Sequence, residues 1–198
     1  MDLVIAAEQR LEKVVAVFNN LFACEFNTRL LGGVAEPVYI PAGHSAAQAT
    51  EDNSLADICD YHRLYFREDY FSSALHESSH WCIAGVERRR QLDFGYWYNP
   101  DGRSPVQQQV FEQAETKPQA LEWMFSQACG QSFRISADNL AADLQASEHF
   151  IQAVAGQAQD WCAKPMPSRG ELFLNALARQ FGQPDFRCSE QYQRTKLL

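Results

Sequence analysis

Apolar residues recur at helical spacing in the first part of the chain. Good helix formers separate them, so residues 3–19 are expected to form an amphipathic helix. The same spacing predicts further helices over residues 71–84, 106–128, 138–162 and 170–181. Lys117-Pro118 falls inside one of these segments, and we expect the proline there to open a new helix rather than to interrupt one.

Short runs of β-branched and aromatic residues predict strands between these helices. The runs are residues 38–41, 62–67, 94–98 and 132–136. Small polar residues predict a loop over 42–57, and the polar tail 183–198 is expected to be loosely held. The mixture favours an α+β fold, with a small sheet of three or four strands packed with five or six helices. A length of 198 residues suits one domain, residues 1–198.

Composition and charge restrict the classes of function. A net charge of −8 argues against general nucleic-acid binding through a basic surface. No apolar stretch approaches the roughly 20 residues that span a bilayer, and the N-terminus does not have the pattern of a signal peptide. We therefore expect a cytoplasmic protein without a membrane partner. The six cysteines are dispersed without a CxxC pair, which predicts reduced thiols.

The segment His76-Glu77-Ser78-Ser79-His80 is the strongest chemical signal in the chain. Two histidines four positions apart lie above one another on a helix face, from which both can reach one divalent ion. In zinc proteases, the glutamate of the pattern His-Glu-x-x-His serves as general base. The competing interpretation is an ordinary helix with surface histidines and a surface glutamate. We expect a metal site on this helix.

A site of this kind needs a third ligand, and Glu87 is the candidate that we favour. On a straight helix Glu87 would lie about 16 Å from His76 along the axis, so the chain must turn back after His80. Gly85 can supply this turn because it tolerates positive φ. The competing interpretation is that Glu87 is a solvated charge paired with nearby arginines. Other candidates for the third ligand are Glu112, Glu115, His62 and His149.

Two segments of the chain resemble the elongation factor P hydroxylase family. They are residues 74–85, which contain the histidine motif, and residues 88–98, which begin with Arg88-Arg89-Arg90 and end with Tyr96-Trp97-Tyr98. The resemblance extends over nearly the whole chain. It implies an enzyme that hydroxylates a lysine of translation elongation factor P after that lysine has received a β-lysyl group. It also implies a two-histidine, one-carboxylate metal site and a fold like that of a bacterial metal-dependent endoribonuclease.

By this resemblance, His76 and His80 take the two histidine roles, Fe(II) is the expected metal and molecular oxygen is the co-substrate. Such a ligand set keeps positions open for oxygen and substrate, although catalytic zinc would also suit it. The assignment of Glu87 as the carboxylate is an inference from helix geometry. Glu77 is turned about 100° from His76, which disfavours coordination and leaves it a catalytic role beside the metal. No signature for 2-oxoglutarate is evident, so the electron donor stays open.

Arg88, Arg89 and Tyr96 are the predicted substrate-binding residues. A basic patch beside the metal would attract an acidic protein partner despite the overall negative charge. The competing interpretations are a solvated cluster at a helix end and, for Tyr96, buried packing. The alternative function is a zinc metallohydrolase, a peptidase or nuclease, with Glu77 as general base. A binding protein with a metal-stabilised fold is a third possibility.

Overall fold

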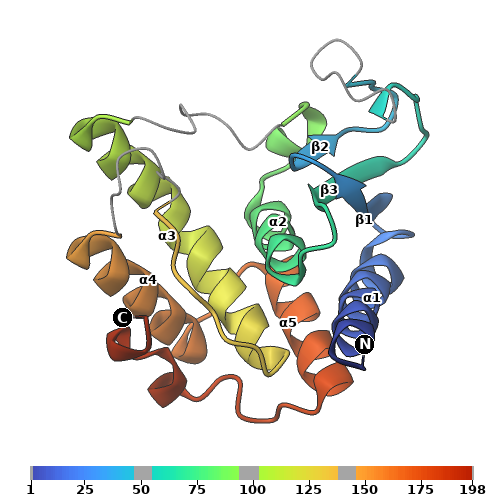
Figure 1. The fold of residues 1–198 in the computed structure, drawn as a ribbon. Helices are drawn as coiled ribbons and strands as arrows, with labels where there is room; N and C mark the ends of the chain where they lie inside the picture. The colour runs from blue at the N-terminus through green and yellow to red at the C-terminus, as the bar shows by residue number, and fades with distance from the viewer. Residues whose placement is uncertain (1, 47–54, 94–102, 138–145, 198) are drawn as a thin grey trace. The chain divides into compact units, whose positions relative to one another are not determined.

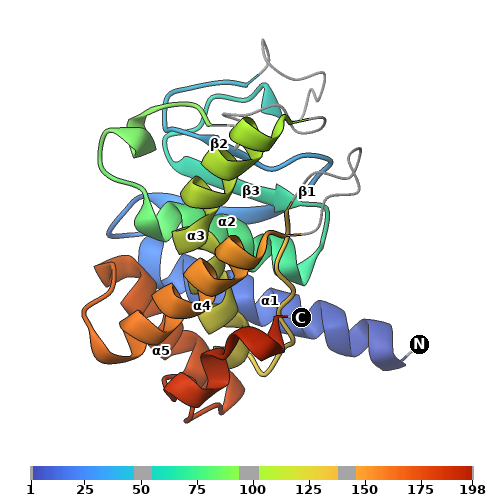
Figure 2. The same cartoon turned by 90° about the vertical axis from the view of Figure 1, so that its left-hand side faces the viewer.

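The computed structural model of the chain describes residues 2–46, 55–93, 103–137 and 146–197 (Figures 1 and 2). The chain divides into two compact units, which are Met1–Gly95 and Tyr96–Leu198. The first unit combines a sheet with helices, and the described part of the second unit is helical. The predicted α+β class is therefore confirmed. None of the described helices is both long enough and apolar enough to cross a membrane.

The first unit is a three-stranded sheet with two long helices. Its elements are α1 (Asp2–Phe22), β1 (Thr28–Val34), β2 (Val38–Ile40), β3 (His62–Arg67), α2 (Phe71–Ile83) and the 3-10 helix η2 (Arg88–Arg90). The strand order is β1-β3-β2, with β1 parallel and β2 antiparallel to the central strand β3. A single bridge between Tyr39 and Asp93 attaches the segment after η2 to β2. The helix over 71–84 and the strands over 38–41 and 62–67 were predicted, and they are confirmed.

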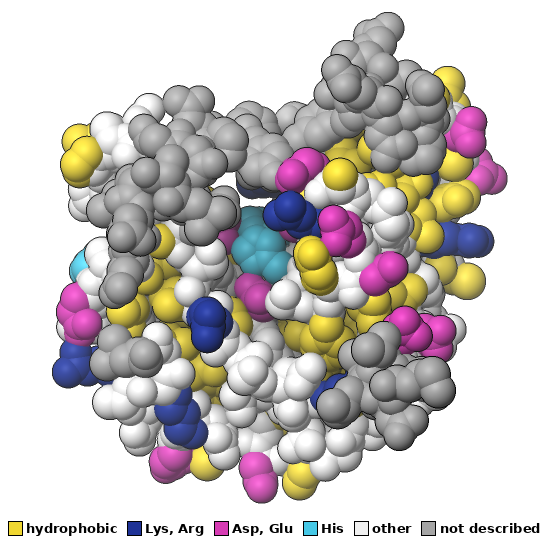
Figure 3. All heavy atoms as spheres, viewed as in Figure 1, with side chains coloured by type: hydrophobic (Ala, Val, Ile, Leu, Met, Phe, Trp, Pro, Cys, Tyr) yellow, Lys and Arg dark blue, Asp and Glu magenta, His cyan; other side chains and the backbone are white. Residues whose placement is uncertain are grey.

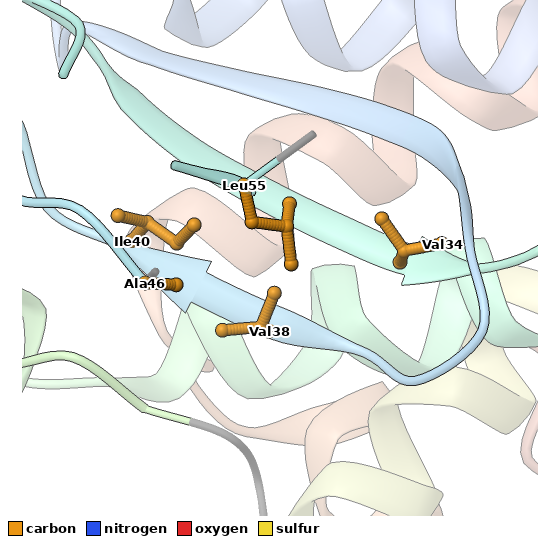
Figure 4. Close-up of a cluster of buried hydrophobic side chains, with 5 residues drawn as sticks. All are labelled: Val34, Val38, Ile40, Ala46 and Leu55. Carbon is orange, nitrogen blue, oxygen red and sulfur yellow. The ribbon is translucent and has the colours of Figure 1, made fainter. Parts of the chain in front are cut away.

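The sheet is held by apolar side chains on both faces. On one face lies a cluster of five buried residues, shown in Figure 4, which are Val34, Val38, Ile40, Ala46 and Leu55. The helices α1 and α2 pack against β1 and β3 (Figure 1). A side chain at Gly32 would approach the ring of Phe66 to 2.7 Å, so close contact between β1 and β3 requires glycine there. Glycine is uncommon in strands, which explains why β1 was not predicted.

The second unit contains α3 (Pro105–Ala128), α4 (Glu148–Ala163) and α5 (Ser168–Phe181), followed by the 3-10 helices η4 (Ser189–Tyr192) and η5 (Arg194–Lys196). The helix α3 packs against both α4 and α5. Ser104 begins α3 with a capping box that it shares with Gln107, and Gly182 ends α5 in the left-handed conformation with φ of 67°. The predicted helix over 170–181 is confirmed.

Three predictions in this unit are wrong. Pro118 lies inside one continuous helix instead of opening a second one. Residues 118–126 are buried without exception, and this packing outweighs the single backbone hydrogen bond that proline removes. Residues 132–136 form no strand, because the backbone of Ser136 pairs with the side chain of Gln119. The third error is the tail, which packs through Tyr192, fully buried with its ring 5.1 Å from that of Trp123.

Two further predictions fall partly or wholly outside the described residues. The strand over 94–98 lies there, as does the first part of the helix predicted over 138–162. The described part of that helix begins at Glu148, after the N-cap Ser147, whose hydroxyl accepts a hydrogen bond from the backbone N–H of Phe150. The prediction that residues 1–198 form one domain stays a prediction.

Candidate metal centre

The helix α2 is fixed in the first unit by an aromatic cluster around Trp81. The ring of Trp81 lies 5.1 Å from that of Phe18, 4.8 Å from Phe22 and 5.7 Å from Phe26. Aromatic pairs at these separations stabilise packing beyond the area that they bury. Because Trp81 is next to His80 in the chain, this packing also fixes the position of the last turn of α2.

The two serines of the motif are buried polar residues whose hydroxyls are satisfied by the helix itself. Ser78 donates a hydrogen bond of 2.7 Å to the carbonyl of Ala74, and Ser79 donates one of 2.7 Å to the carbonyl of His76. Buried hydroxyl groups without such partners would cost free energy. The small serines therefore let the motif lie in a packed helix without an unsatisfied polar group at either position.

The structure brings His76 and His80 together as expected. Their Nε2 atoms are 3.1 Å apart, and the ring centroids are 4.7 Å apart at an angle of 65°. Two nitrogens that each lie about 2.1 Å from one ion are roughly 3.0 to 3.4 Å apart for bond angles of about 90 to 110°. Both side chains are half-buried. The two rings thus fit a shared divalent ion.

Glu87 is not brought to these histidines. Its side chain is 80% exposed and forms an ion pair of 3.0 Å with Arg90. After α2 the chain continues through Ala84 in an extended conformation, and Gly85 is not among the residues of positive φ. Among the residues that the structure describes, no group of three potential metal ligands contains Glu87. The sharp turn that this assignment required is missing, and the carboxylate is solvated instead.

The arginines of η2 are engaged with neighbouring groups rather than forming an open basic patch. Arg88 forms an ion pair of 2.8 Å with Asp93, and Arg90 pairs with Glu87. The guanidinium of Arg89 lies 5.8 Å from the ring centroids of both Phe26 and Trp81. Tyr96, the third predicted substrate-binding residue, lies outside the described residues. On the face in Figure 3, acidic and basic side chains are interspersed.

A small pocket lies beside His80 in the first unit. Its cavity of about 40 Å³ has room for roughly three water molecules or the end of one side chain. Its charged and polar lining consists of Glu77, His80 and Asp93 together with Arg88 and Arg89, two of the predicted substrate-binding residues. Apolar lining comes from Val38, Leu64, Trp81 and Ala84. Glu77 and His80 therefore line the same pocket.

Two of the alternative ligands, His62 and His149, are not part of a candidate metal site in the described residues. The Nδ1 atom of His62 accepts a hydrogen bond of 3.0 Å from the backbone N–H of Ala42. Burial lowers the pKa of His62, and the charges of Arg89 and His44 lower it further, which keeps the ring neutral and able to accept. His149 is exposed on α4. Neither histidine belongs to a group of three potential ligands within the described part of the chain.

A row of buried polar side chains runs along one face of α3. Its members recur at helical spacing and are Gln108, Glu112, Glu115, Gln119 and Glu122. Glu112 has a structural partner, because its carboxylate accepts hydrogen bonds from the Ser147 backbone N–H at 3.2 Å and hydroxyl at 2.5 Å. Glu115 instead accepts a hydrogen bond of 3.4 Å from the side chain of Gln119. Polar residues at this spacing therefore form a buried polar face of α3.

Comparison with known proteins agrees with the resemblance noted in the sequence. The profile of the family described as elongation factor P hydroxylase matches residues 17–192. A protein of Haemophilus influenzae, named elongation factor P lysine hydroxylase, is 43% identical over 178 residues, which cover 90% of this chain and 93% of that protein. This extent and identity show that the chain belongs to the elongation factor P hydroxylase family.

Proposed function

We propose that this protein hydroxylates the β-lysyl-modified lysine of translation elongation factor P in an Fe(II)- and oxygen-dependent reaction. The observation that carries the proposal is the convergence of two histidine Nε2 atoms, 3.1 Å apart, in a member of this family. The name of the Haemophilus influenzae relative supports a lysine of elongation factor P as the target. We propose that the reaction takes place in the cytoplasm, because the proposed substrate is a translation factor.

The proposed metal ligands are His76 and His80, completed by one carboxylate. Glu87 is not preferred as that carboxylate, because its side chain is exposed and paired with Arg90. Two histidines and one carboxylate are the ligand set of many non-haem Fe(II) oxygenases, which keep positions open for other ligands. A bound iron would supply the activation of molecular oxygen that no side chain can provide.

In this proposal the chain's own residues bind and orient the substrate. A modified lysine is a chain of methylene groups that carries ammonium groups. The pocket beside His80 offers apolar walls from Val38 and Leu64 to such methylenes, and Glu77 is a carboxylate that can accept hydrogen bonds from an ammonium group. Glu77 would therefore hold the substrate rather than bind the ion.

Mass spectrometry of elongation factor P tests the activity directly. Modified factor incubated with the purified protein, Fe(II), oxygen and a reductant should gain the mass of one oxygen atom. His76→Ala should abolish this gain because it removes a proposed ligand. His149→Ala is the matched control, since His149 is exposed and belongs to no group of three potential ligands among the described residues. A wild-type protein that leaves the modified factor unchanged would refute the proposal.

Metal analysis separates the proposal from its main alternative. Protein purified without oxygen should contain iron. Protein that contains zinc and hydrolyses a peptide or nucleic acid would support a metallohydrolase instead, with Glu77 as the base that activates water. The two outcomes are distinguishable because only the hydroxylase adds oxygen to the factor without cleaving a bond of its backbone.

A further inference from the structure

Arg89 lines the pocket beside His80, and its charge is not paired with a carboxylate in the described part of the chain. The side chain is half-buried, and its guanidinium lies against the rings of Phe26 and Trp81. Its Nε atom is buried and has no hydrogen-bond partner among the described residues. Aromatic rings compensate only part of the hydration that a cation loses, so a ligand that brings an oxygen acceptor to this guanidinium is favoured.

The backbone around Arg89 is fixed to the sheet of the first unit. The hydroxyl of Tyr39 donates a hydrogen bond of 2.8 Å to the carbonyl of Arg89. Tyr39 also exchanges two backbone hydrogen bonds with Asp93, of 2.7 and 3.0 Å. A guanidinium on a fixed backbone and against packed rings loses little conformational freedom when it binds an acceptor. The position of Arg89 is therefore preorganised for recognition.

The charged lining of this pocket favours a ligand with two kinds of group. Two carboxylates, Glu77 and Asp93, and two guanidiniums, Arg88 and Arg89, line the pocket. Arg88 and Asp93 form an ion pair of 2.8 Å with each other. A purely anionic ligand would meet the two carboxylates, and a purely cationic ligand would bring no acceptor to Arg89. A ligand that carries both an ammonium group and a neutral oxygen acceptor suits this lining best.

We propose that Arg89 determines specificity by donating hydrogen bonds to the carbonyl oxygen of the amide that joins the β-lysyl group to its lysine. This inference rests on the proposed function and names the group that the enzyme recognises in its substrate. The amide exists only in the modified lysine, whereas both forms of the lysine carry an ammonium group. An unmodified lysine would therefore bring no acceptor to Arg89. Hydrogen bonds that involve one charged group typically contribute about 10- to 100-fold in affinity.

The test measures how Arg89→Met and Arg90→Met bind elongation factor P, with the factor in its modified and unmodified forms. Calorimetry without oxygen measures the affinities, so that no turnover occurs. Methionine keeps an unbranched apolar stem against the rings but has no N–H donor in its side chain. Arg89→Met should weaken binding of the modified factor by about 10- to 100-fold. It should change the affinity for the unmodified factor by less than about twofold, because that form lacks the amide.

Arg90→Met is the matched control. Arg90 is exposed in the same 3-10 helix, pairs with Glu87 and is not part of the pocket lining. Its replacement should change both affinities by less than about twofold. Thermal unfolding of each variant checks that it is folded. Arg89→Gln, whose amide is uncharged and shorter, serves if Arg89→Met does not fold, and it should lose the same preference for the modified factor.

Each outcome decides the inference. A wild-type protein that binds both forms of the factor alike would overturn it, as would an Arg89 variant that keeps the full preference for the modified form. An equal loss of affinity for both forms would overturn it too, because Arg89 would then attract the factor by charge without recognising the amide. The proposed function fails separately, if the wild-type protein adds no oxygen to the modified factor. If that oxygen is added and the Arg89 variants keep the preference, only the role of Arg89 is refuted.

Discussion

Glu115 and Glu87 have opposite surroundings, although the sequence offers both as candidate metal ligands. Glu115 is 8% exposed, and Gln119 donates a hydrogen bond to it. Glu87 lies in solvent beside Arg90. A buried carboxylate costs free energy unless hydrogen bonds or a cation compensate its charge. The hydrogen bond from Gln119 contributes to this compensation for Glu115, whereas water and Arg90 compensate the charge of Glu87.

At the scale of one residue, the prediction concerns Glu87. Glu87→Gln should leave metal affinity and hydroxylation within about twofold of the wild type, since an exposed ion pair contributes little. His80→Ala, measured in parallel, should lose both because it removes a proposed ligand. Metal titration and mass spectrometry of elongation factor P measure the two effects. An inactive but folded Glu87→Gln protein would return Glu87 to the set of metal ligands.

At the scale of elements, α3 is unusual because it continues through Pro118. Proline removes one backbone N–H and crowds the carbonyl four residues earlier, at a cost of about 3 kcal/mol in a helix interior. Its own side chain is buried, so part of that cost is offset by packing. The packing of the neighbouring buried residues of α3 offsets the rest.

Replacing this proline should stabilise the protein. Pro118→Ala restores the missing hydrogen bond, and we expect the free energy of unfolding to rise by about 1 to 2 kcal/mol, less than the full cost because some packing is lost. Lys117→Ala, at the exposed neighbouring position, is the control and should change the free energy of unfolding by less than about 0.5 kcal/mol. Urea unfolding measures the free energy of unfolding of both variants. A destabilised Pro118→Ala protein would mean that the packing of the proline ring outweighs the strain.

The elements that the sequence predicts well are those whose signal is local. The strand of residues 62–67 and the helix that carries His76 and His80 follow from alternation and helical spacing alone. By contrast, β1 contains Gly32 because of a close contact with Phe66, more than thirty residues away in the chain. The alternation over 132–136 is satisfied by a side chain, Gln119, instead of a neighbouring strand. Such pairings depend on tertiary contacts that no periodicity reveals.

The residues of the candidate site also differ in how far the sequence alone predicts them. The spacing of His76 and His80 places their ring nitrogens together without any further information. The carboxylate could not be derived from spacing, because several acidic residues follow the motif. Helix geometry favoured the nearest one, Glu87, which the structure leaves exposed and paired with Arg90. Which acidic residue joins the histidines is a property of the fold rather than of the motif.

For the whole molecule, net charge and local charge have to be considered separately. The chain carries a net charge of −8, and the arginines after α2 do not form an isolated basic patch. Arg88 and Arg90 are paired with acidic neighbours, and Arg89 lies against aromatic rings. Recognition of an acidic protein partner through Arg88 or Arg90 would have to break an ion pair. The shape of the pocket beside His80, which Arg88 and Arg89 also line, is therefore better placed to determine specificity.

Metal binding should also be visible in the stability of the whole protein. An ion that binds the folded chain and not the unfolded chain stabilises it by about 2.7 kcal/mol at 100 times its dissociation constant, which for a chain of this size corresponds to a rise in Tm of roughly 5 to 10 °C. Thermal unfolding without oxygen, with and without added Fe(II), measures this shift. His76→Ala and His80→Ala should both lose it, and His149→Ala should retain it. An equal shift in all three variants would show that the ion binds elsewhere, because the first two variants lack a proposed ligand and the third lacks none.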